Sequence, residues 1–317
     1  MQIILRSNKL ELPAPSVIAK TQLTIALNKE KSLENKNKTG IIAFQGVIGA
    51  NSHVACLEAY PNIQPQAYET FDAAMEAVTS GEAALAMIPV GNSYAGRVAE
   101  IHNIIPKTKL SIVGEHFSRI EHYLCGVQGS NLNDIKEVYS HPQALMQCQK
   151  SIEKLGLKAN KTNNTALAAQ QISEKQDKAK AAICSKLAAE IYGLDVLQKN
   201  FEDDSSNTTL FLTFAKEPID PDPEKYKDII TSMMFTTRNI AAGLYKALGG
   251  FATNNVNIIK LESYIPETES AQAQFFISFE GSPRQKNVQM AIEELGFFTK
   301  RTKLLGVYPA AKKRSVK

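Results

Sequence analysis

The sequence predicts an α/β protein with two lobes around a cleft, followed by a ferredoxin-like domain with the element order βαββαβ. Between Gly40 and Tyr192, short apolar strands alternate with amphipathic helices in two successive sets, which is typical of mostly parallel α/β sheets. Pro218–Pro223 then holds three prolines in six residues. Because neither a helix nor a strand continues through such a run, it predicts a linker. After the linker the pattern of apolar segments changes to the ferredoxin-like order.

The first set of elements begins with a buried strand at 41–44 and a glycine turn at Gly46 and Gly49. Asn51 or Ser52 is expected to cap the helix that follows. The other elements expected in this set are helices at 71–78 and 97–105 and strands at 83–90 and 110–115.

The second set is expected to form the second lobe. Its predicted elements are strands at 123–127 and 180–184, helices at 143–155 and 165–176, and a helix capped by Ser185 that ends at Tyr192. Two α/β sets in series predict a cleft between lobes, which is where small ligands bind.

The ferredoxin-like domain is about 90 residues long, a normal size for a small domain. Its expected elements are strands at 228–236, 256–264, 274–280 and 302–308 and helices at 241–254 and 287–295. The predicted organisation is a flexible lead-in at 1–40, the two-lobed domain at 41–216, a linker at 217–227, the ferredoxin-like domain at 228–311 and a basic tail at 312–317.

Composition limits the class of protein. Of the 317 residues, 44% are hydrophobic and 21% are charged, and the net charge is only +4, as in a soluble globular protein. No apolar run approaches the roughly 18 residues that span a bilayer, and no basic stripe predicts nucleic-acid binding. We therefore expect a cytoplasmic protein with no membrane or nucleic-acid partner. The basic clusters near both ends fit either an anionic partner or solvated tails, and we favour solvated tails.

The four cysteines are scattered, without a CxxC pair or a histidine at metal-ligand spacing. They are Cys56, Cys125, Cys148 and Cys184. Each lies among apolar residues, which predicts buried thiols rather than disulfides or a metal site.

Several loops place polar groups where a strand meets a helix. The glycine turn at 46–53 can present backbone N–H groups to an anion, or can be a tight turn with a good cap. Asn92 and Ser93 follow a strand, where ligands bind in α/β sheets, although a plain turn explains them as well. His53 and His141 are lone histidines, and structural roles fit them best.

Taken together and in order, these segments resemble the bacterial prephenate dehydratase family over nearly everything from Ile41 to Tyr308. The matching positions are Gly46, Gly49, Asn51, Ser52, His53, Pro89, Asn92, Ser93, Ser140 to Cys148, Thr165, Ala166, Ala168, Ala169, Asn207, Thr209 and Phe211. The resemblance implies a first domain like the periplasmic binding proteins and a C-terminal ACT regulatory domain.

The resemblance also implies an enzyme of L-phenylalanine biosynthesis that converts prephenate to phenylpyruvate, losing water and CO2, with no metal and no organic cofactor. It makes Thr209 the catalytic hydroxyl. The residues that it places at the substrate are Asn207, Asn92, Ser93, Ser140, Thr165, Phe211, Gly49 and Asn51. Prephenate is a dianion whose hydroxyl leaves poorly, so its site needs donors for two carboxylates and for the leaving group.

Regulation by bound L-phenylalanine, as feedback inhibitor between ACT domains of a homodimer or homotetramer, is implied in the same way. The residues expected at that ligand are Ala242, Gly243, Leu244, Glu262 and Ser263. Tyr264 and Ile265 stand where the family has Arg-Pro, which removes a cation and a rigid turn.

Two departures bear on activity. Leu210 stands where the family has arginine, and Gly91 stands where it has glutamate. If the arginine binds a substrate carboxylate, its loss should cost about 2–5 kcal/mol. If it instead pairs with the glutamate, the two losses compensate, because no buried charge is left alone. Two functions therefore stay open: an active dehydratase, and a catalytically impaired relative that senses aromatic metabolites.

Overall fold

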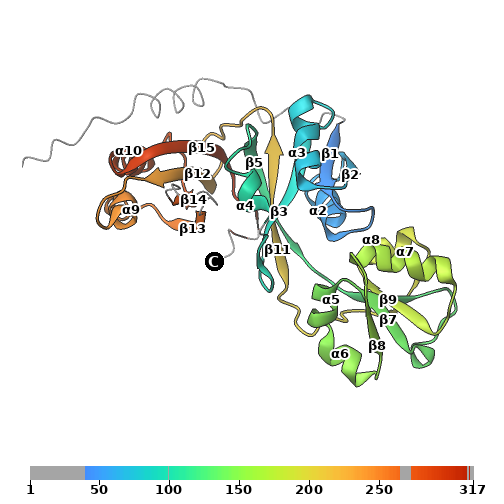
Figure 1. Cartoon of the computed structure of the whole chain (residues 1–317). Coiled ribbons are helices and arrows are strands. Elements are labelled where there is room, and N and C mark those ends of the chain that lie inside the picture. The colour runs from blue at the N-terminus through green and yellow to red at the C-terminus, as the bar shows by residue number, and fades with distance from the viewer. Residues whose placement is uncertain (1–39, 99, 265–272, 313, 315–317) are drawn as a thin grey trace, which may run out of the picture. The chain divides into compact units, whose positions relative to one another are not determined.

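The computed structural model describes residues 40–98, 100–264, 273–312 and 314 (Figure 1). Almost all of the expected lead-in at 1–40, Ile265 and most of the expected tail at 312–317 lie outside these residues. The chain divides into two compact units. Of the described residues, one unit contains Ile219–Pro309, and the other contains those from Gly40 to Pro218 together with those from Ala310 onward. The predicted fold class, a two-lobed α/β domain and a ferredoxin-like domain, is confirmed.

The first lobe is built on a sheet with the strand order β2-β1-β3-β11-β5, and β4 pairs with β3. Its elements are β1 (Ile41–Gln45), α2 (Asn51–Ala59), β2 (Gln64–Tyr68), α3 (Phe71–Ser80), β3 (Leu85–Asn92), β4 (Gly96–Arg97), α4 (Ile101–Ile104), β5 (Ser111–Arg119) and β11 (Thr208–Ala215). Strand β1 runs parallel to β2 and β3, whereas β11 is antiparallel to β3 and β5. The sheet is therefore mixed, because β11 returns from the second lobe to lie between β3 and β5.

The second lobe has the strand order β10-β6-β9-β7-β8. Its elements are β6 (Tyr123–Gly126), the 3₁₀ turn η2 (Leu132–Asp134), β7 (Glu137–Ser140), α5 (Pro142–Gln147), α6 (Gln149–Lys154), β8 (Lys158–Lys161), α7 (Thr165–Lys175), β9 (Lys180–Cys184), α8 (Lys186–Ile191) and β10 (Asp195–Gln198). Alternate residues of β9 belong to different cores, because side chains alternate across a strand. Ala182 and Cys184 pack with residues of α7 and α8, whereas Ala181 and Ile183 pack with residues of α5 and α6.

The ferredoxin-like unit has the predicted order βαββαβ and an antiparallel sheet, β13-β14-β12-β15. Its elements are β12 (Ile229–Thr237), α9 (Gly243–Thr253), β13 (Ile258–Tyr264), β14 (Gln274–Glu280), α10 (Lys286–Phe298) and β15 (Thr299–Pro309). Both helices pack on one core with β12 and β14, through residues such as Phe235, Phe251 and Phe279.

Three local predictions are wrong. Arg97 does not begin a helix: it lies in β4, and the following helix α4 is limited to Ile101–Ile104. The helix predicted at 143–155 is two helices, α5 and α6, that meet at Cys148. Neither Asn51 nor Ser52 caps α2, whose N-cap is Ala50 without a side-chain hydrogen bond. Ser185 does cap α8, and its hydroxyl accepts the Ala188 N–H at 3.0 Å.

The segment after β15 differs from the solvated tail that we expected. Arg314 forms a 2.8 Å salt bridge with Glu115 of β5, whose side chain is 1% exposed. Its guanidinium also lies 4.9 Å from the ring centroid of Phe117, and the Ala311 N–H donates to Glu115. A buried carboxylate needs such partners, which is why this segment belongs to the larger unit.

Two further predictions concern composition. All four cysteines are free and buried, as predicted. Within residues 40–314, leaving out the short stretches that are not described, we find no helix with the length and apolar character of a membrane span.

Candidate active site

A row of three polar side chains crosses the first sheet where β3 ends and β11 begins. Thr209 of β11 lies directly opposite Asn92 of β3 and, on its other side, directly opposite Ser118 of β5. Side chains of directly opposite residues project from the same face of an antiparallel pair. The sheet therefore brings Asn92, Thr209 and Ser118 together on one face, although the sequence separates them widely.

The amide of Asn92 has only one possible orientation in this row. Its Oδ1 accepts the backbone N–H groups of Tyr94 and Ala95, at 2.9 and 2.8 Å. The Nδ2 group is thereby directed toward Asn207 Oδ1 at 2.8 Å and Thr209 Oγ1 at 2.9 Å. The oxygen and nitrogen of a side-chain amide have nearly the same shape, so they are distinguished by their hydrogen bonds. Here the two backbone donors identify the oxygen.

This orientation determines what the Thr209 hydroxyl does. Its oxygen accepts a hydrogen bond from Asn92 Nδ2, so its own proton is free to be donated. An amide donor also stabilises negative charge that develops on the hydroxyl oxygen as that proton moves. The Thr209 hydroxyl is therefore able to donate a hydrogen bond of its own.

The amide of Asn207 is oriented in turn by Asn92. Because Asn207 Oδ1 accepts from Asn92, its Nδ2 faces away from Asn92, and Asn207 is 1% exposed. Among the described residues, this Nδ2 and the Ser118 Oγ have no hydrogen-bond partner. Asn207 is one of the predicted site residues, whereas Ser118 is not, because the strand expected at 110–115 extends to Arg119 in the structure.

Ser93 attaches the loop after β3 to β11. Its backbone N–H donates to Thr208 O at 2.9 Å, and its hydroxyl accepts the Thr208 N–H at 3.0 Å. Four of the predicted site residues, Asn92, Ser93, Asn207 and Thr209, are thus brought together. Phe211, two positions after Thr209 in β11, lies in the apolar core of the first lobe at 1% exposure.

The glycine turn is held by His53. Its Nδ1 accepts the Gly49 N–H at 3.0 Å, and its ring stacks on Phe44 with centroids 5.3 Å apart. Burial lowers the pKa of His53 below its usual value, so the neutral ring that accepts this bond is favoured. Asn51 is the first residue of α2.

Gly49 also joins the two lobes. Its carbonyl accepts the Ser185 hydroxyl of the second lobe at 2.7 Å. A Cβ added at Gly49 would lie 2.9 Å from Ala188 Cα, closer than real side chains come. Glycine is therefore required for the approach of the lobes at this point.

The other two predicted residues belong to the second lobe. The Ser140 hydroxyl is fully buried and donates to Ile183 O at 2.6 Å, so its proton is already used. Thr165 is the first residue of α7, whose N-cap Asn164 accepts the Leu167 N–H. Among the described residues, no hydrogen bond joins Ser140 or Thr165 to the row around Thr209.

The residues predicted to bind phenylalanine lie at the start of α9 and in β13. Ala242 has a left-handed backbone with φ of 55°, and α9 begins at Gly243. Leu244 packs against the core. Glu262 pairs with Lys260 at 3.2 Å, and Ser263 follows it in the strand.

The two departures from the family pattern are neighbours in space. Leu210 lies directly opposite Gly91 across the β11–β3 pair. Since successive side chains of a strand point to opposite faces, both positions face away from the row formed by Asn92, Thr209 and Ser118.

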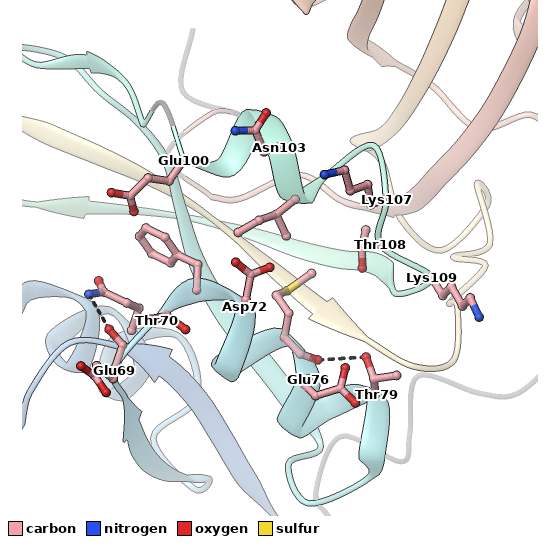
Figure 2. Close-up of a pocket in the computed structure, with 14 residues that line it drawn as sticks. Glu69, Thr70, Asp72, Glu76, Thr79, Glu100, Asn103, Lys107, Thr108 and Lys109 are labelled. Carbon is pink, nitrogen blue, oxygen red and sulfur yellow. Dashed lines mark hydrogen bonds between the residues drawn. The ribbon is translucent and has the colours of Figure 1, made fainter. Parts of the chain in front are cut away.

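Figure 2 shows a separate hollow of about 790 Å³, to which α3 and α4 contribute. Four acidic residues line it, Glu69, Asp72, Glu76 and Glu100, and so do Lys107 and Lys109. None of the predicted site residues lines this hollow.

Comparison with known proteins gives a family for this arrangement. A sequence profile of the prephenate dehydratases matches residues 42–219. This chain belongs to the prephenate dehydratase family. That assignment confirms the predicted resemblance. It relates this chain to the dehydratases of aromatic amino acid biosynthesis.

Curated relatives cover most of the chain. A bifunctional N-acyl-homoserine lactone acylase/prephenate dehydratase of Komagataeibacter europaeus is 42% identical, over 87% of this chain and 98% of its own. Arogenate dehydratase/prephenate dehydratase 2 of Arabidopsis thaliana is 35% identical, over 93% of this chain and 77% of its own.

Solved structures agree with the fold. A structure described as a novel type of quorum-quenching acylase matches with a TM-score of 0.81 and 42% identity, over 86% of this chain and 99% of its own. The prephenate dehydratase of Arthrobacter aurescens, in complex with L-Phe, matches with a TM-score of 0.77 and 25% identity, over 86% and 91%.

Proposed function

We propose that this protein is a working prephenate dehydratase, which converts prephenate to phenylpyruvate with loss of water and CO2. The observation that carries the proposal is the 2.9 Å hydrogen bond from Asn92 Nδ2 to Thr209 Oγ1. It leaves the Thr209 proton for the substrate, as a dehydration requires.

The reaction consumes one proton. The bond between the ring and its carboxylate breaks, and the electron pair enters the ring as CO2 leaves. At the same time the bond from the ring to its hydroxyl breaks, and the departing hydroxide takes up the proton to become water. Thr209 assists by donating to the departing oxygen. Aromatisation of the ring provides the driving force.

Substrate binding in this proposal uses donors rather than an arginine of β11. The Asn207 Nδ2 is a buried donor directed away from Asn92, and Asn92 and Ser93 shape the adjacent loop. Gly49, Asn51, Ser140 and Thr165 remain predicted contacts, of which Ser140 acts through its position in β7 because its proton is used. Phe211 supports the site from the core.

The position of Leu210 supports activity. Its partner across the strands is Gly91, so the arginine and glutamate that the family carries at these positions would be cross-strand neighbours, able to pair with each other. Because both are replaced together, on the face away from Thr209, no charge is left unpaired.

Regulation by L-phenylalanine is the second part of the proposal. We infer that the ligand binds at Ala242, Gly243 and Leu244 with Glu262 and Ser263, in a homodimer or homotetramer. The left-handed start of α9 leaves backbone N–H groups at a helix N-terminus, where a carboxylate is favoured. The related structure that contains L-Phe supports this ligand.

The test is phenylpyruvate formation from prephenate by the purified protein, measured by its alkaline absorbance, with and without L-phenylalanine. Turnover that phenylalanine suppresses is expected. Folded protein that binds phenylalanine but lacks turnover would instead support the impaired sensor. Arogenate belongs in the same assay, since relatives carry both activities in their names.

The bifunctional relative raises a second candidate activity, the hydrolysis of N-acyl-homoserine lactones. That reaction needs an activated nucleophile. The bond that Thr209 receives comes from a neutral amide, which is not a general base, so the site favours the dehydratase. Release of homoserine lactone from an acylated substrate, at a rate that Thr209→Val abolishes, would favour the acylase.

A further inference from the structure

Three consecutive carboxylates lie where the chain returns from the second lobe to the first. The first, Glu202, is buried and accepts the His122 N–H at 2.9 Å. The second, Asp203, accepts the N–H groups of Lys150 and Ser151 at the start of α6, at 2.9 and 3.1 Å. Asp203 therefore attaches the returning segment to the second lobe.

The third carboxylate, Asp204, attaches the same segment to the first lobe. Its Oδ1 accepts the Ser206 N–H at 2.7 Å, and its Oδ2 accepts the Tyr94 hydroxyl at 3.1 Å. Ser93 holds the start of the loop after β3 against Thr208, whereas Tyr94 lies at the tip of this loop, before β4. Because the Tyr94 side chain is 50% exposed, packing restrains it less than a core side chain. The bond to Asp204 therefore carries much of the restraint on the tip.

A continuous chain of hydrogen bonds leads from Asp204 to the Thr209 hydroxyl. The backbone N–H of Tyr94 donates to Asn92 Oδ1 at 2.9 Å, and Asn92 Nδ2 donates to Thr209 Oγ1 at 2.9 Å. Tyr94 thus bonds to the carboxylate with its side chain and to the Asn92 amide with its backbone. If the tip of the loop moved, the N–H that orients Asn92 would move with it.

We propose that Tyr94 and Asp204 are positioning residues, whose hydrogen bond holds the loop after β3 so that Asn92 Nδ2 stays directed at Thr209 Oγ1. The kinetic part of the proposal rests on the function proposed above. In that function Thr209 donates to the departing oxygen, so the support from Asn92 matters most in the transition state. Loss of the bond between Tyr94 and Asp204 should therefore affect kcat more than KM.

Tyr94→Phe removes the hydroxyl and keeps the ring. We expect kcat for prephenate to fall about three- to tenfold, the effect of one hydrogen bond of ordinary strength, with KM close to that of the wild type. Amide hydrogen exchange in 92–96 should become faster by a similar factor, because the N–H groups of Tyr94 and Ala95 are bonded to Asn92.

The experiment compares the wild type with Tyr94→Phe, Asp204→Ala, the double variant and Tyr68→Phe. Tyr68→Phe is the matched control, since the Tyr68 hydroxyl donates to the carboxylate of Glu82 in the same lobe at 2.7 Å. It should change neither kcat nor exchange in 92–96. The double variant should have the kcat of Asp204→Ala, because the two residues act through one bond. The measurements are kcat and KM, hydrogen–deuterium exchange by mass spectrometry, and the midpoint of thermal unfolding.

Faster exchange in 92–96, a lower kcat, an unchanged KM and an unchanged midpoint in Tyr94→Phe would support the proposal. It is overturned if Tyr94→Phe keeps the kcat and exchange of the wild type, or if its midpoint falls together with kcat. It is also overturned if the losses of the two single variants add in the double variant, or if Tyr68→Phe loses as much. Wild-type protein without turnover would refute the proposed function, whereas exchange in 92–96 would still decide whether Tyr94 holds the loop.

Discussion

At the scale of single residues, the Asn92 amide organises the candidate site. Its oxygen is committed to two backbone N–H groups of its own loop, so its nitrogen is committed to Asn207 and Thr209. One short loop thereby determines which atoms of the neighbouring side chains remain available to a ligand. Asn92 does not engage the Thr209 proton or the Asn207 Nδ2, and the Nδ2 is buried.

The Thr209 hydroxyl is expected to be the main catalytic group. Thr209→Val keeps the shape of the side chain and removes the donor, so we expect kcat for prephenate to fall by about 10²–10⁴-fold, as for loss of a positioned acid. The measurement is steady-state phenylpyruvate formation.

Thr208→Val is the matched control for this substitution. Thr208 is the adjacent residue of β11 and points to the other face, where its hydroxyl donates to Ser206 O. Its replacement should leave kcat close to that of the wild type. Equal losses in the two variants would show that the strand, and not the Thr209 hydroxyl, is responsible.

His53 gives the protein a pH dependence. Burial lowers the pKa of His53, and also those of His122 and His141. In the unfolded chain a histidine has a pKa of about 6.5. Because the folded-state pKa is lower, the contribution of these neutral histidines to the free energy of unfolding is complete above about pH 6.5, and it is lost as the pH falls through the folded-state pKa.

We therefore expect the free energy of unfolding to decrease when the pH is lowered from about 7 to 5, across the range set by these shifts. Urea unfolding followed by circular dichroism measures it, since the chain contains no tryptophan. His53→Gln should reduce the decrease, because protonation of His53 removes the acceptor for the Gly49 N–H. The same decrease in this variant would exclude His53 as a contributor.

At the scale of elements, strand β11 separates two roles by alternation. Thr209 faces the row with Asn92 and Ser118, whereas Leu210 faces the other side with Gly91 and Phe117. A substitution at one of two adjacent positions therefore need not affect the other. This is the physical reason why the loss of the family arginine is compatible with a complete polar row.

A double-mutant cycle tests this separation. In Leu210→Arg and Gly91→Glu a charge is introduced without its intended partner, while the double variant restores a cross-strand pair. We expect a coupling free energy of about 0.5–1 kcal/mol between the two positions, from urea unfolding. Leu210→Arg alone should leave kcat/KM for prephenate within a few-fold of the wild type. A strong rise in activity would mean that the arginine binds substrate and that its loss impaired the enzyme.

At the scale of the whole molecule, the larger unit depends on contacts between distant parts of the chain. Strand β11 completes the first sheet although it follows the whole second lobe in the sequence. Gly49 contacts Ser185 of the second lobe and lies close to Ala188. The segment after β15 adds Arg314 to the buried Glu115. These contacts join the glycine turn to the second lobe and the segment after β15 to β5, the strand that carries Ser118.

Gly49→Ala tests the contact between the lobes. Gly49 has φ of 88°, and an added Cβ would meet Ala188 Cα at 2.9 Å. Gly156→Ala is the control, since Gly156 has φ of 63° with nothing within 4 Å of an added Cβ. Backbone strain alone should cost about 1–2 kcal/mol in each variant, and the clash should cost Gly49→Ala about 1–3 kcal/mol more. Equal losses of unfolding free energy in the two variants would contradict a required close approach.

The sequence by itself determined the fold class, the order βαββαβ and most of the residues that meet around Thr209. It succeeded because apolar periodicity and glycine, proline and capping residues act locally, as at Ser185 and in the run of prolines at 218–223. Its errors at Arg97 and at Cys148 are also local, since short elements are set by what packs against them.

Only the tertiary structure decided which distant residues are partners. Ser118 joins the site because β11 lies between β3 and β5 in one register, and Leu210 faces Gly91 for the same reason. The salt bridge between the buried Glu115 and Arg314 likewise joins segments that are 199 residues apart in the sequence. Such pairings arise from the packing of strands against one another, and no local pattern of residues specifies them.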